Sequence, residues 1–161
     1  MSVDAAKIWR AIVAAQMRRQ QRAKDELEAV RQDMLAAEAA HNAAAAETAQ
    51  ACERRRIHED GLRELLAGSL SAALYLSHDA WRSHLRGEVQ AKQARERQVH
   101  DALEKHERKV AVVRTKLARI DAALDKCQRK LKQIEDDTRR RREESADEEA
   151  IEALLARRAL R

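Results

Sequence analysis

The stretch that decides the fold runs from residue 99 to residue 134 and reads VHDALEKHERKVAVVRTKLARIDAALDKCQRKLKQI. It carries a stripe of residues at alternating steps of four and three, all aliphatic except for one His and one Cys, with mostly charged residues or Ala between them. The stripe consists of Val99, Leu103, His106, Val110, Val113, Leu117, Ile120, Leu124, Cys127, Leu131 and Ile134. A helix cannot bury so narrow a stripe against itself, and its 3.5-residue period is that of a left-handed coiled coil. The stretch therefore predicts a long helix that packs against a partner helix.

The composition favours long helices over a compact globular core. Pro and Phe are absent, aromatic residues make up 2% of the chain, and charged residues make up 38%. Large aromatic side chains dominate most globular cores, whereas a chain rich in Ala, Glu, Lys, Leu and Arg is typical of coiled coils. The length of 161 residues is that of one domain. The sequence therefore predicts an all-α fold, organised as a single domain over residues 1–161.

A second, weaker heptad pattern in the first half of the chain supplies the partner helix. Its positions are Leu27, Val30, Met34, Ala37, His41, Ala44, Thr48 and Ala51. The segment GSLSAALYLSHD, residues 68–79, holds one of three glycines, three serines and two residues that can cap a helix, Ser77 and Asp79. We therefore expect a long antiparallel two-helix coiled-coil hairpin, with one helix over about 4–67, a bend over about 68–78, and a second helix over about 79–157.

The two stripes also predict how the helices align. Centring the bend near residue 73 places Leu27 opposite Ile120, Met34 opposite Val113, and His41 in one layer with His106. The heptad pattern alone equally allows a slip of seven residues. A parallel homodimer through the second helix is the alternative to the hairpin. Helices joined by a short bend usually pack on each other, so the prediction is a monomeric hairpin.

Arginines gather near both ends of the chain and form the predicted partner-binding residues. They are Arg10, Arg18, Arg19, Arg22, Arg139, Arg140, Arg141 and Arg142. The net charge of +5 permits acidic partners without requiring them. The last four arginines fit three interpretations: a solvated helix surface, a site for an acidic protein, or a nucleic-acid or anionic-lipid site. The two glutamates that follow them, at 143 and 144, and the splaying of four consecutive side chains around a helix favour the solvated surface.

Other candidate sites have structural explanations. His41 and His106 could form a metal pair or a pH sensor, but no Glu or Cys completes a ligand set, and polar seam residues can fix the alignment of a coiled coil. Cys52 and Cys127 lack the spacing of metal ligands, and we interpret both as reduced thiols. The apolar cluster at Ile8–Val13 is short for a membrane-surface helix. No apolar run approaches the roughly 20 residues of a membrane span.

The sequence contains no catalytic motif. It has neither a glycine-rich phosphate loop nor a nucleophile elbow, and two paired helices offer little of the concavity that a small-molecule site requires. We therefore expect a protein that is not an enzyme and that uses no cofactor, metal or small-molecule substrate.

The chain resembles the central stalk proteins of bacterial type III secretion and flagellar export, the FliJ/YscO type. The matching features are the basic segment MRRQQRAKDELEAVRQD at residues 17–33, the bend in mid-chain, the uninterrupted second heptad, and the charged segment EESADEEAIEALLARR at residues 143–158. The resemblance covers most of the chain and rests on architecture and charge. It leaves open whether the system is flagellar or serves virulence.

The resemblance implies a cytoplasmic, non-enzymatic stalk, placed peripherally at the inner-membrane export apparatus. The partners it implies are the hexameric secretion ATPase, the export gate protein and substrate chaperones. Two other functions stay open from the sequence: a basic coiled coil that binds nucleic acid or anionic membrane, and a structural spacer.

Overall fold

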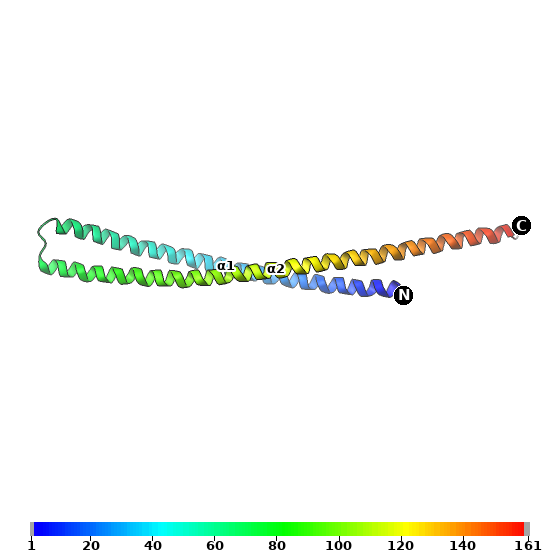
Figure 1. Cartoon of the computed structure of the whole chain (residues 1–161), viewed down its shortest axis with the longest axis horizontal. Coiled ribbons are helices and arrows are strands. Elements are labelled where there is room, and N and C mark those ends of the chain that lie inside the picture. The colour runs from blue at the N-terminus through cyan, green and yellow to red at the C-terminus, as the bar shows by residue number, and fades with distance from the viewer. Residues whose placement is uncertain (1, 160–161) are drawn as a thin grey trace. The chain divides into compact units, whose positions relative to one another are not determined.

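The fold consists of two long helices that run antiparallel (Figure 1). The structure is a computed structural model that describes the backbone of residues 2–159 and the side chains of residues 5–158. Helix α1 spans Ser2–Leu66 and helix α2 spans Ala72–Ala159, and no strand occurs among the described residues. The predicted all-α helical hairpin is therefore confirmed.

The bend is shorter than expected and lies earlier in the chain. It occupies residues 67–71, and α2 begins at Ala72, seven residues before the predicted start at 79. Ser71 explains the early start: its Oγ accepts a hydrogen bond from the Leu74 N–H at 3.3 Å, and its C=O accepts one from the Tyr75 N–H at 3.0 Å. A serine with these bonds is an N-cap, so residues 72–78, which were predicted as part of the bend, form the first turns of α2.

The chain divides into two compact units, and each helix contributes to both. The first unit, here called the terminal unit, comprises Met1–Glu26 and Val113–Arg161. The second, here called the bend unit, comprises Leu27–Val112 and contains the bend.

The buried residues of both units fall on the heptad positions of the two stripes or on the continuation of the same four-three repeat beyond them. On α1 they are Ala6, Ala23, Leu27, Ala44, Thr48, Ala51 and Leu62, and on α2 they are Leu85, Val89, Val110, Val113 and Leu124. The remaining predicted seam residues are half-buried: Val30, Met34, His41, Leu103, His106, Leu117, Ile120, Leu131 and Ile134. Many of the α1 residues are alanines, and small seam residues allow two helices to approach closely. The core is therefore a thin line of contacts with few large side chains.

Contacts between the helices show a register that differs from the predicted one by a heptad. In the bend unit the His41 ring lies beside the His100 ring, with centroids 5.2 Å apart, so the predicted shared layer of His41 and His106 is wrong. The terminal unit has the same register around residues 20–26, where Lys116 donates to Glu26 at 2.5 Å and Gln20 donates to Asp121 at 2.7 Å.

Charge pairing explains why this register is preferred. In the bend unit Glu47 lies 3.7 Å from Arg95, and Arg54 pairs with Glu88. In the predicted register the heptad position of Arg54 would instead face that of Arg95, which would oppose two like charges. Like charges across a helix pair disfavour that alignment, whereas the observed one joins opposite charges.

Candidate partner-binding surface

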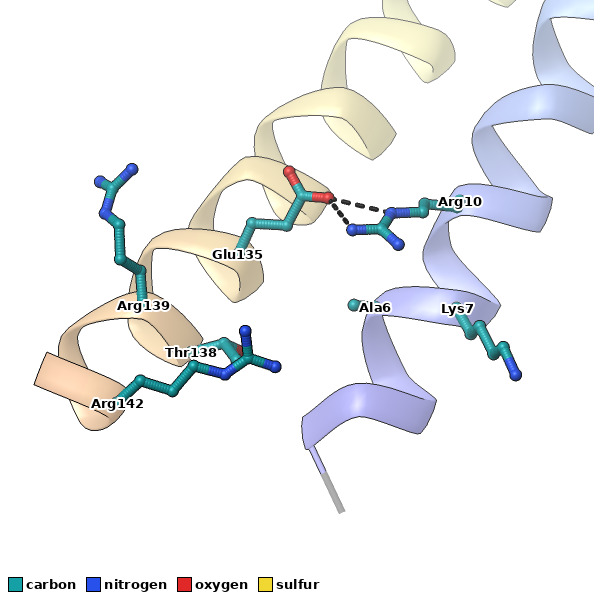
Figure 2. A pocket seen from close by; sticks show the side chains of 7 residues that line it. All are labelled: Ala6, Lys7, Arg10, Glu135, Thr138, Arg139 and Arg142. Carbon is teal, nitrogen blue, oxygen red and sulfur yellow. Dashed lines mark hydrogen bonds and ion pairs between the residues drawn. The ribbon is translucent and has the colours of Figure 1, made fainter. Parts of the chain in front are cut away.

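A pocket in the terminal unit gathers cationic side chains from both helices (Figure 2). It has a volume of about 660 Å³ and is lined by Ala6, Lys7 and Arg10 of α1 and by Glu135, Thr138, Arg139 and Arg142 of α2. Ala6 is a small residue at a buried heptad position, so it leaves room between the helices. The Thr138 hydroxyl donates to the Ile134 C=O at 2.7 Å, which ties that side chain back to its own helix.

One ion pair crosses this pocket. The Arg10 guanidinium donates from Nε at 3.0 Å and from Nη2 at 2.8 Å to Oε1 of Glu135, and Figure 2 shows the two side chains reaching toward each other. The side chains remain 63% and 42% exposed, and such exposed pairs contribute about 0–1 kcal/mol each. A partner carboxylate could therefore compete for Arg10 at little energetic cost.

The other arginines of the pocket differ in how far their charge is already neutralised. Arg139 lies 2.8 Å from Asp136 and 4.0 Å from Glu143. Arg142 is exposed and has no ion pair among the described residues, and Figure 2 shows it pointing from α2 toward α1. The pocket thus offers at least one cation without a carboxylate partner, in a setting open to water.

The three arginines at 18, 19 and 22 lie outside the pocket, on the part of α1 that belongs to the terminal unit. All three are exposed, and none forms an ion pair with another described residue. The heptad positions of Arg18 and Arg22 are on the outer side of the helix, whereas Arg19, four residues before the buried Ala23, lies beside the seam. Their charges are therefore fully available to a partner.

The predicted basic residues consequently separate into groups. Arg10, Arg139 and Arg142 come together in the pocket, whereas Arg140 lines a different one, beside Arg129 and Asp137. Arg141 is exposed and lines neither of these two pockets.

Sequence reasoning missed Lys7 and Glu135 as members of the pocket. Lys7 precedes Arg10 by three residues, a spacing that places both on one helix face, so it could have been found. Glu135 lies only two residues from the position that the predicted register places opposite Arg10, so this pair could also have been found.

Two histidine pairs lie in the bend unit. The first pair is His41 with His100. In the second pair, Nε2 of His58 lies 3.3 Å from Nδ1 of His78. Among the described residues, no group of three or more His, Cys, Asp or Glu is arranged to hold a metal ion. The described helices also contain no stretch that is long and apolar enough to cross a membrane.

Two carboxylates in the bend unit have perturbed pKa values. A hydrogen bond from Lys92 at 2.6 Å, together with the charges of Lys92 and Arg95, lowers the pKa of Glu47. A hydrogen bond from Arg56 lowers the pKa of Glu53. Both shifts come from ion pairs at the surface, so they describe charge pairing and not a catalytic group.

Fold and surface together define an α-helical hairpin that presents exposed arginines in the same unit as a cationic pocket. A model of the HrpB7 family, described as a bacterial type III secretion protein, matches residues 4–158. The chain belongs to this family of bacterial type III secretion proteins. No curated protein and no solved structure gives a significant match to the chain.

Proposed function

We propose that this chain is a non-enzymatic stalk or adaptor of the type III secretion apparatus and that its terminal unit binds the hexameric secretion ATPase. The observation that carries the proposal is the exposed, unpaired state of Arg18, Arg19 and Arg22. Membership of a type III secretion family supports the same role. Contacts with the export gate and with substrate chaperones, which the stalk resemblance implies, stay predictions.

The positive charge at the surface of the terminal unit suits a partner whose acidic or polar surface surrounds the stalk. Rim charges steer the encounter of two proteins and orient them, while each exposed ion pair adds little affinity. The contact should therefore be graded and sensitive to salt. An asymmetric stalk inside a six-fold ring cannot contact all six subunits in the same way. Weak contacts that can form with one subunit and re-form with another suit such a partner better than one tight, fixed contact.

Charge reversal tests the proposal directly. The triple variant Arg18→Glu, Arg19→Glu, Arg22→Glu should keep the helix content and melting temperature of the native chain, because none of the three side chains packs in the core. It should bind the purified ATPase much more weakly, and it should support less protein export in the native bacterium. Binding by the native chain should also weaken as salt is added, because salt screens exposed charges.

A matched control comes from the bend unit. Arg86, Arg97 and Lys105 are also exposed and form no ion pair among the described residues, so their reversal to Glu changes the net charge equally. We expect this control to bind the ATPase as the native chain does. If both triple variants bind and export normally, the spacer function is favoured and the proposal is wrong. If salt-dependent binding is found to DNA or to anionic vesicles and not to the ATPase, the basic surface serves one of those ligands.

A further inference from the structure

The last part of α2 carries a second apolar stripe that the hairpin does not bury. Ile151, Leu154 and Leu155 are 56%, 65% and 60% exposed, and every described side chain from 139 to 158 is exposed. The segment 143–158, here called the distal segment, is nevertheless helical throughout. An exposed cluster of large aliphatic residues on a charged helix marks an interaction surface.

Most of this stripe lies off the line of the hairpin seam. The four-three repeat that ends at Leu131 and Ile134 would place its next positions at Thr138, Arg141, Ser145, Glu148, Glu152 and Leu155. All of these except Leu155 are polar, and Ile151 and Leu154 lie beside that line on the helix. The distal segment is therefore suited to a partner other than α1.

The two ends of the distal segment carry opposite charges, so that one copy of the segment is complementary to a second copy in the antiparallel orientation. Five acidic residues precede the apolar cluster, at Glu143, Glu144, Asp147, Glu148 and Glu149, and the basic residues Arg157 and Arg158 follow it. When two copies align antiparallel, Ile151 of each faces Leu154 of the other. The same alignment places Asp147 opposite Arg158 and Glu148 opposite Arg157. A parallel alignment would instead oppose acidic block to acidic block, which is repulsive.

We propose that the distal segment is a self-association site, at which two copies of this chain pair antiparallel through Ile151 and Leu154 and are oriented by the flanking charges. Such an interface is isologous, because each copy contributes the same patch. Two short helices bury less than the roughly 1,200–2,000 Å² of a stable interface, so the dimer should be weak and should depend on concentration and salt. The proposal goes beyond the role at the ATPase and does not rest on it.

A pair of complementary charge variants tests the proposal without relying on a folding defect. One variant carries Arg157→Glu and Arg158→Glu, and the other carries Asp147→Arg and Glu148→Arg. Sedimentation velocity should show a dimer for the native chain and none for either variant alone, because like charges then face each other in both halves of the pair. Mixed in equal amounts, the two should form a heterodimer, because each reversed site faces its complement. Circular dichroism should show the same helix content in all samples.

Leu154→Asp gives an independent check of the apolar contact, and it should abolish the native dimer. A native chain that remains monomeric at the highest soluble concentration would overturn the proposal. So would self-association that the charge variants leave unchanged, since the contact would then lie elsewhere. If the native chain stays monomeric and Leu154→Asp weakens binding to the ATPase, the occupant of the stripe is the ATPase and not a second copy.

Discussion

Leu124 is one of the few large side chains that α2 buries, at 7% exposure. Because alanines occupy many buried positions of α1, each large side chain on α2 supplies a substantial share of the apolar contact. Leu→Ala at a buried site costs about 2–5 kcal/mol, and small folds have little stability to spare. Substitutions at exposed positions usually change stability by less than about 0.5 kcal/mol. The burial of single residues therefore predicts which substitutions matter.

Leu124→Ala should lower the free energy of unfolding by about 2 kcal/mol or more, since it removes a buried side chain from a thin core. Leu35→Ala is the matched control, because Leu35 is 52% exposed and loses the same atoms. Urea unfolding followed by circular dichroism measures both. Equal effects of the two substitutions would show that the stripe on α2 is not the core.

Glu47 gives a pH-dependent prediction. Its pKa is lowered from the ordinary 4.5 by the hydrogen bond and charge of Lys92. A carboxylate with a lowered folded-state pKa contributes stability that is present above the unfolded-state value and is lost as the pH falls through the folded-state value. The contribution of Glu47 should therefore be constant near neutral pH and disappear only below about pH 4.5.

Replacing the partner lysine tests this assignment. In Lys92→Met, an NMR titration should show that the pKa of Glu47 rises toward 4.5. Glu53 is the internal control: Arg56 on the same helix lowers its pKa, so the substitution should leave that pKa where it was. An unchanged titration of Glu47 would mean that Lys92 is not its main partner.

At the scale of helices, the sequence predicted the two elements and their antiparallel pairing but not their register. The stripe from Val99 to Ile134 repeats every seven residues, so a slip by one heptad again places apolar residues opposite each other. Two local features decide between the alternatives. Ser71 starts α2 early, and Arg54 and Glu47 pair across the helices with Glu88 and Arg95, whereas the other register would place Arg54 opposite Arg95.

Disulfide formation can distinguish the two registers within the bend unit. In a chain whose native cysteines are replaced by serine, the pair His41→Cys with Val99→Cys should cross-link rapidly under mild oxidation, because His41 lies beside residue 100. The pair His41→Cys with His106→Cys should not, since seven residues of helix separate the sites by about 10 Å along the axis. Efficient cross-linking of the second pair alone would restore the originally predicted register.

At the scale of the whole molecule, the sequence predicted the class of protein better than it predicted the site. Composition and heptads were sufficient to predict an all-α hairpin. The arrangement of charged residues supported the resemblance to type III secretion proteins, and the family match confirms that class. The pocket was harder, because Arg10 and Glu135 are 125 residues apart in the sequence and a heptad pattern does not show a hollow between the helices. Partner contacts depend on surfaces of other proteins, which this sequence does not encode.

Photo-cross-linking in the native bacterium tests the proposed contact with the secretion ATPase most directly. A photoreactive amino acid replaces either Arg22, in the terminal unit, or Arg97, an exposed arginine of the bend unit. We predict that irradiation joins the chain to the ATPase from position 22 and not from position 97. Cross-links to the ATPase from position 97 alone, or from position 22 only to other proteins, would contradict the proposal that the arginines of the terminal unit bind the ATPase.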